Sequence, residues 1–146
     1  MREAVIVSTA RTPIGKAYRG AFNDTEAPAM GGHVVKHAVE RAGIDPGQVD
    51  DVILGLAGPQ GTQGYNIGRL SAMAAGLPET VSGMQVDRMC SSGLMTIGLA
   101  AKAIMTNEQD ILVAGGLESI SLVQNKHKNS YRAVSKAVLA KSPHMY

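Results

Sequence analysis

The sequence has little cysteine, few aromatic residues and little charge. One cysteine among 146 residues leaves no internal disulfide partner and excludes a metal site built from several cysteines. Aromatic residues make up 3% of the chain and charged residues 18%, against the ~25% charge usual in globular domains. Alanine, glycine, serine and methionine take their place, so we expect closely packed elements.

Long apolar runs and basic patches are also missing. No run approaches the ~20 apolar residues that a membrane helix needs, and the first residues do not form a charged and apolar leader. The formal net charge is +2, without the basic and aromatic clusters of nucleic-acid-binding motifs. We therefore expect a soluble cytoplasmic protein that binds neither membrane nor nucleic acid.

Short apolar runs alternate with segments of helical periodicity along the chain. This alternation predicts an α/β fold with a parallel, layered sheet, in which sites lie at the carboxyl ends of the strands. The first run is rich in β-branched residues, which is typical of a strand buried on both faces. The predicted strands are residues 4–8, 49–54, 81–86 and 110–114, and the predicted helices are residues 27–43, 67–75 and a segment that begins at Cys90.

Two patterns resemble ligand sites, but a simpler interpretation is better for each. His33 and His37 have the spacing of a metal-binding pair, yet the glutamate that follows the first histidine in zinc-protease helices is absent and both rings lie on the polar helix face. We expect no metal site. Glycines recur at every third position over residues 55–64 without the spacing of a dinucleotide or phosphate-binding loop, which predicts a flexible loop above a strand end.

Cys90 lies where the third predicted strand gives way to a helix, and Ser91 or a neighbour can cap that helix. The partial positive charge of a helix N-terminus favours a thiolate, which is the nucleophile in covalent catalysis. No charged residue occurs between Arg88 and Lys102, so we expect a buried helix. A lone cysteine can equally be a small buried apolar residue, and the residues alone leave both interpretations open.

The stretch around the cysteine, Val-Asp-Arg-Met-Cys-Ser-Ser-Gly at residues 86–93, resembles the thiolases, the acetyl-CoA acyltransferase family. The resemblance extends over nearly the whole chain, and its matching segments occur in the family's order. These segments are residues 11–15, 41–44, 63–69, 75–78 and 114–121.

The resemblance implies the N-terminal half of a thiolase-like layered fold, with a mostly parallel sheet and helices on both faces. Residues 1–120 would form an incomplete α/β domain, and residues 121–146 would begin an inserted loop region that binds coenzyme A. The implied substrate is a coenzyme A thioester, with no permanently bound cofactor and no cofactor-binding residues assigned. The full-length protein would be a homo-oligomer, a dimer or tetramer, active in fatty acid metabolism.

By the same resemblance, Cys90 would take an acyl group from the thioester as a covalent intermediate. A second acyl-CoA, or free coenzyme A, would then receive it, so the reaction is 3-ketoacyl-CoA cleavage or acetyl-CoA condensation. The backbone N–H of Cys90 is a candidate donor to the thioester oxyanion. The family has asparagine where Asp87 stands, and a carboxylate there would oppose thiolate formation unless Arg88 or hydrogen bonds offset it.

The family's other catalytic segments, Gly-x-His-Pro and Cys-x-Gly-Gly, do not occur in this sequence, and His144 precedes methionine instead of proline. We therefore expect this chain to be inactive on its own. Two alternatives remain open. One is a non-catalytic, truncated thiolase-like fragment. The other is a condensing enzyme of the ketoacyl-synthase type, which also places a cysteine at the head of a buried helix.

Overall fold

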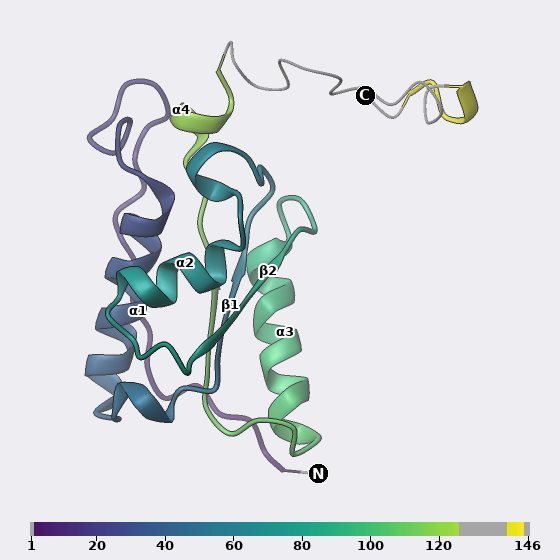
Figure 1. The fold of residues 1–146 in the computed structure, drawn as a ribbon. Helices are drawn as coiled ribbons and strands as arrows, with labels where there is room; N and C mark the ends of the chain where they lie inside the picture. Colours follow the sequence, from purple (N-terminus) through teal and green to yellow (C-terminus); the bar gives the residue numbers. More distant parts are fainter. Residues whose placement is uncertain (1, 126–139, 145–146) are drawn as a thin grey trace.

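The computed structural model describes residues 2–125 and 140–144, and a parallel three-stranded sheet lies at their centre (Figure 1). The strand order is β2-β1-β3, and β1 pairs with each neighbour in parallel. The strands are β1 (Asp51–Gly55), β2 (Ser82–Val86) and β3 (Leu112–Gly116); the α-helices are α1 (Ala27–Ala42), α2 (Ile67–Ala74), α3 (Ser92–Met105) and α4 (Ile120–Val123); and short 3-10 turns cover Pro46–Gln48 and Gly61–Gln63.

Helices cover both faces of the sheet. Figure 1 shows α1 and α2 on one face and α3 on the other. This arrangement confirms the predicted α/β architecture, and the three later predicted strands agree with the observed ones to within two residues at each end.

The helix α1 ends where the sequence predicts, because Gly43 adopts the left-handed conformation (φ 67°) that closes a helix C-terminus. Its glycines let α2 approach closely. A Cβ on Gly31 would lie 2.1 Å from the Ser71 hydroxyl oxygen, and one on Gly32 would lie 2.7 Å from Cβ of Ala74. The backbone of α1 at these glycines therefore lies directly against the side chains of α2, and the two helices form one layer.

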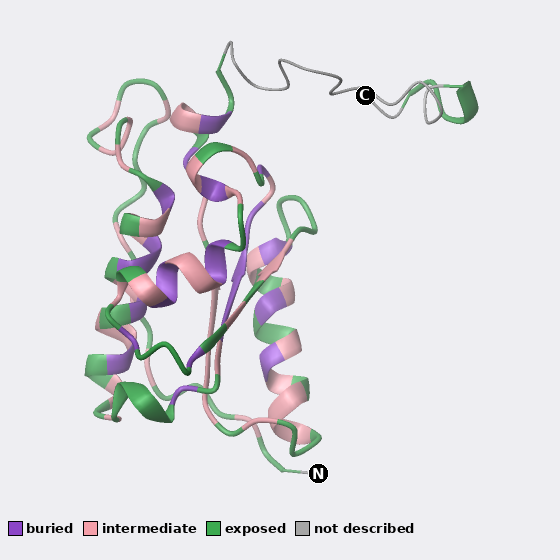
Figure 2. Cartoon of the chain, in the orientation of Figure 1, coloured by how far each residue is buried: buried purple, intermediate pink, exposed green. Residues whose placement is uncertain are grey.

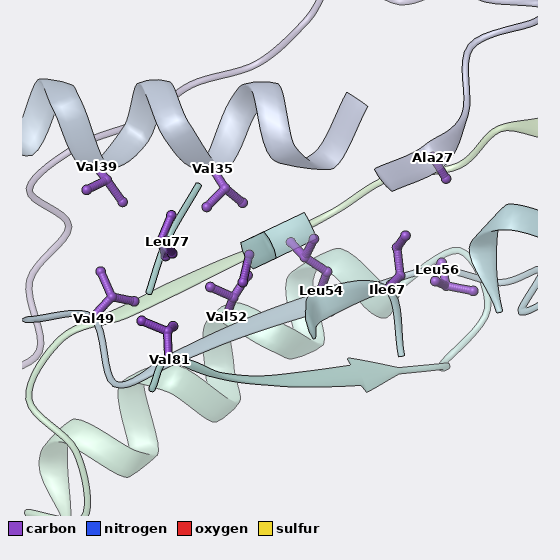
Figure 3. Close-up of a cluster of buried hydrophobic side chains, with 11 residues drawn as sticks. Ala27, Val35, Val39, Val49, Val52, Leu54, Leu56, Ile67, Leu77 and Val81 are labelled. Atoms are coloured by element: carbon purple, nitrogen blue, oxygen red, sulfur yellow. The ribbon is translucent and has the colours of Figure 1, made fainter. Parts of the chain in front are cut away.

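The main hydrophobic core lies between this helical layer and the sheet (Figure 3). The central strand β1 is buried on both faces, as is usual for a parallel strand covered by helices on each side; Figure 2 shows it in the colour of buried residues. The core side chains are those of Ala27, Val35, Val39, Val49, Val52, Leu54, Leu56, Ile67, Ala72, Leu77 and Val81.

The prediction of a buried first strand at residues 4–8 is wrong. This segment has no regular structure, and the side chains of Val5, Ile6 and Val7 are 65%, 75% and 74% exposed. This segment and β3 both line an apolar cavity of about 460 Å³, and the segment is not a strand of the sheet. β-branched residues favour strands only where a neighbouring strand supplies hydrogen bonds and packing.

The prediction that the helix after Cys90 is buried is also wrong for the described residues. The side chains of Thr96 and Ala100 face the sheet and are buried, but Leu94 is 76% exposed and Ile97 is 41% exposed. The missing charges correctly indicate an apolar helix, but within the described part of the chain the sheet is the element that packs against it, on one side (Figure 1).

Of the expected loop region 121–146, the structure describes only residues 121–125 and 140–144, so most of that prediction lies outside the described residues. Within the described part of the chain, no helix combines the length and the apolar character needed to cross a membrane.

Backbone contacts between glycines set the position of α3 on the sheet. A Cβ on Gly55, at the end of β1, would lie 2.4 Å from the carbonyl carbon of Ser92. A Cβ on Gly116, at the end of β3, would lie 3.1 Å from Cα of Gly93. The first turn of α3 therefore rests directly on the strand ends, where larger residues would hold it away.

We predict that Gly55→Ala lowers the free energy of unfolding by about 1–3 kcal/mol, because the added methyl group forces α3 off the sheet. The matched control is Gly98→Ala, at an exposed position of α3, where the new Cβ would meet no atom within 4 Å beyond its chain neighbours and the backbone of its own helix. That change should stabilise the protein by about 0.5–1 kcal/mol through backbone entropy. Urea denaturation measures both, and equal effects would contradict the contact at Gly55.

Candidate active site around Cys90

Cys90 is exposed in the turn that links the carboxyl end of β2 to α3. The helix begins two residues later, at Ser92, and Ser91 occupies the N-cap position without a side-chain capping hydrogen bond. The predicted strand-to-helix junction is therefore confirmed, although the helix start lies slightly further along the chain. Because the side chain is exposed, its interpretation as a small buried apolar residue is wrong.

The turn before Cys90 is tight. Met89 adopts a left-handed backbone conformation (φ 50°), which is uncommon for a residue with a side chain. The Oδ1 atom of Asp87 accepts a hydrogen bond from the Met89 N–H (2.9 Å), and the Arg88 carbonyl accepts one from the Ser91 N–H (3.2 Å). The side-chain oxygen of asparagine could accept the same bond, so aspartate at position 87 preserves the turn and changes its charge.

The buried hydroxyl group of Ser92 forms hydrogen bonds with the backbone of this turn. Ser92 is 2% exposed, and its Oγ accepts a hydrogen bond from the Arg88 N–H (2.8 Å). The single O–H of the same hydroxyl is shared between the carbonyl oxygens of Met89 (2.5 Å) and Leu56 (3.1 Å), either of which can accept it. Leu56 directly follows β1, so Ser92 ties the cysteine turn to the central strand.

A second polar group connects the loops that follow β1 and β3. Glu118 accepts hydrogen bonds from the Ala57 N–H (2.8 Å) and from Nε2 of the fully buried Gln63 (2.6 Å). The same Nε2 donates to the Gly58 carbonyl (2.7 Å), and Oε1 of Gln63 accepts a hydrogen bond from the Ser119 N–H. The glycine-rich loop therefore lies above the end of β1, as predicted, and is packed and hydrogen-bonded there.

No local pattern in the sequence marks Ser92, Gln63 or Glu118 as part of the site. All three occur in segments that resemble the thiolases, which was the available signal, but each bonds to residues far away in the sequence. Gln63 and Glu118, for example, are 55 positions apart. Such pairings cannot be derived from local patterns.

The carboxyl end of the sheet also borders a cavity of about 570 Å³ between the loop of residues 10–17 and residues 116–121. Arg11, Lys16 and Glu118 contribute charged groups to its lining, while Cys90 does not line it. The cysteine is thus open to solvent beside the end of the sheet.

The histidine pair lies apart from this region, on α1. The rings of His33 and His37 meet edge to face, 4.5 Å apart, and Nδ1 of His37 is 3.3 Å from a carboxylate oxygen of Glu40. Among the described residues, no three or more histidine, cysteine or acidic side chains gather as metal ligands would. This arrangement is that of a solvated helix face.

The geometry around Cys90 suits a reaction at an exposed sulfur. The thiol stands near the N-terminus of a 14-residue helix, whose unpaired N–H groups favour negative charge. The turn is held on both sides by hydrogen bonds, so the sulfur has a defined position relative to the strand ends.

Comparison with known proteins identifies the family of this chain. A family model for the N-terminal domain of thiolase matches residues 4–144. The chain is 47% identical over 123 residues to a 3-ketoacyl-CoA thiolase of Bacillus subtilis (strain 168), covering 84% of this chain and 32% of that protein. It is 42% identical over 121 residues to a probable acetyl-CoA acyltransferase of Staphylococcus aureus (strain NCTC 8325 / PS 47), covering 83% and 30%.

Solved structures give the same result. The crystal structure of the Bacillus anthracis acetyl-CoA acetyltransferase superposes with a TM-score of 0.78 at 40% identity, over 83% of this chain and 30% of the other. The Acat5 thiolase of Ascaris suum, solved in complex with coenzyme A, gives a TM-score of 0.77 at 30% identity, over 82% and 31%. The chain thus spans about a third of the length of the relatives it matches. It belongs to the thiolase family, and the matching part of that family is the N-terminal domain.

Proposed function

We propose that this chain carries the nucleophilic cysteine of a thiolase-type acyl transfer between acyl-CoA and coenzyme A. The observation that carries the proposal is the exposed Cys90, held in a hydrogen-bonded turn before α3 in a segment that matches the thiolase N-terminal domain. The names of the relatives and the coenzyme A complex of one structural neighbour support a coenzyme A thioester as substrate. The family match favours this reaction over that of a ketoacyl synthase.

In the proposed reaction, the Cys90 thiolate attacks the acyl carbonyl carbon and forms a new C–S bond. The carbonyl electrons move to oxygen, where the Cys90 N–H is a candidate donor. When the intermediate collapses, the bond to the leaving group breaks, and the leaving group takes a proton from an acid. Coenzyme A or a second acyl-CoA then accepts the acyl group. Transfer to coenzyme A completes a cleavage reaction, and transfer to a second acyl-CoA completes a condensation.

The proposal assigns the other catalytic groups to segments that this sequence does not contain. The apolar side chains of Leu94 and Ile97, on the same helix as the cysteine turn, remain exposed among the described residues. We infer that more protein covers this face in an active enzyme, and that the full-length form is a cytoplasmic homo-oligomer active in fatty acid metabolism.

If Cys90 is activated by its position, iodoacetamide should alkylate it faster than a model thiol at neutral pH. We expect about a fivefold difference, the size of a favourable charge interaction at a helix N-terminus. The rate is measured by mass spectrometry. The same chain unfolded in urea is the internal control and should react like the model thiol. A folded-state rate at or below the model rate would count against a poised nucleophile.

Asp87→Asn should raise the alkylation rate of Cys90 by about two- to fivefold, because it removes a nearby negative charge whose interaction is weakened by solvent. The asparagine side-chain oxygen can still accept the Met89 N–H, so the turn stays intact. The control is Asp24→Asn, an exposed aspartate in a different loop. An unchanged or lower rate in Asp87→Asn would refute the electrostatic effect.

This chain alone should not turn over acetoacetyl-CoA, because the acid and base groups of the proposed mechanism are absent from its sequence. A coupled assay for acetyl-CoA formation tests this with the purified chain. Cys90→Ser is the background control. Turnover above that background, in a preparation free of any longer thiolase, would contradict this prediction.

A further inference from the structure

We propose that Ser92 is a positioning residue for Cys90, holding the reactive turn against the central strand through its buried hydroxyl group. This inference rests on the proposed function, since it concerns the placement of the same sulfur. It does not require Ser92 to touch substrate. It requires that the placement of Cys90, and with it any activation of the sulfur, depend on a hydroxyl two residues away.

The hydroxyl of Ser92 makes contacts on both sides of the turn. Its Oγ accepts the N–H of Arg88 (2.8 Å) and lies 2.5 Å from the Met89 carbonyl oxygen. These two residues immediately precede Cys90. Because Met89 is in the left-handed region (φ 50°), the chain must be held there by other contacts, and the serine hydroxyl supplies two of them.

The third contact anchors the turn to the rest of the molecule. The Ser92 hydroxyl lies 3.1 Å from the carbonyl oxygen of Leu56, which is 36 positions away and directly follows β1. Leu56 itself is in the hydrophobic core, and its N–H donates to the Val86 carbonyl at the end of β2. The cysteine turn is therefore attached to a fixed point of the sheet, which limits how far the sulfur can move.

The neighbouring Ser91 is a matched control for Ser92. It is exposed, and its hydroxyl makes a single local hydrogen bond, to the Arg88 carbonyl oxygen (2.8 Å). Water can replace that bond at little cost, whereas the loss of a buried hydroxyl leaves the Arg88 N–H and the Leu56 carbonyl without their partner. The two serines thus differ in burial and anchoring while having the same side chain.

The test compares Ser92→Ala with Ser91→Ala in the full 146-residue chain. Two quantities are measured under conditions in which circular dichroism shows each variant to be folded. The first is the alkylation rate of Cys90 by iodoacetamide at neutral pH. The second is the exchange rate of the Arg88 backbone amide by NMR. Because Cys90 is already exposed, a change in its alkylation rate does not report its accessibility.

We expect Ser92→Ala to lower the alkylation rate about fivefold, to that of a model thiol, as the turn leaves the helix start. Its Arg88 amide should exchange faster. Ser91→Ala should leave both quantities close to wild type. A purely structural role for Ser92 would reduce the unfolding midpoint while the alkylation rate of the folded variant stays unchanged, and that result would overturn the inference.

Two further measurements cover the remaining outcomes. If Ser92→Ala does not fold, Ser92→Thr replaces it, because threonine retains the hydroxyl group. Ser92→Thr should then keep the wild-type alkylation rate of Cys90, and the Arg88 amide of the wild-type chain should be protected from exchange. If either result is not obtained, the inference is overturned. If wild-type Cys90 reacts no faster than a model thiol, the proposed function fails. The anchoring role then stands only if Arg88 exchange accelerates in Ser92→Ala and not in Ser91→Ala.

Discussion

Close contact between backbones at the carboxyl end of the sheet is the constraint on which the rest of the structure depends. Gly55 and Gly116 end two neighbouring strands, and the first turn of α3 meets them at Ser92 and Gly93. Side chains at these strand ends would separate the layers by the width of a methyl group or more. Their absence lets the helix start lie on the sheet, and this places Cys90 beside the strand ends.

Polar groups then keep this close arrangement in register. The Ser92 hydroxyl connects the cysteine turn to the segment after β1, and Glu118 with Gln63 connects that segment to the loop after β3. The segment after β1 is thus held from both sides. Buried hydrogen bonds of this kind contribute modest net stability but carry a large penalty when broken, so they select one geometry among similar ones.

Among the described residues, apolar side chains beside β3 and on α3 are left exposed. Val5, Ile6 and Val7 line a cavity together with β3 and with Ile97 of α3, and Leu94, on the first turn of that helix, is 76% exposed. Both surfaces flank the sheet instead of lying on remote loops. A further layer of protein would bury them, and the chain spans about a third of the length of its relatives.

The sequence by itself determined the features that depend on nearest neighbours along the chain. Helical periodicity over residues 27–43 defined α1, short apolar runs defined the three paired strands, and Cys90 marked the junction before α3. Helical and strand periods repeat within a few residues, so local patterns record them. The order of segments resembling thiolases identified the family for the same reason, since it needs no knowledge of contacts.

Only the tertiary structure decided features that depend on distant partners. Residues 4–8 have strand propensity, but they line a cavity together with β3 and are not a strand of the sheet. The apolar helix after Cys90 is partly exposed because, among the described residues, the sheet packs against one side of it. The role of Ser92 likewise depends on Leu56, 36 positions earlier. Burial and pairing are set by the balance of long-range contacts against chain entropy, which no local pattern contains.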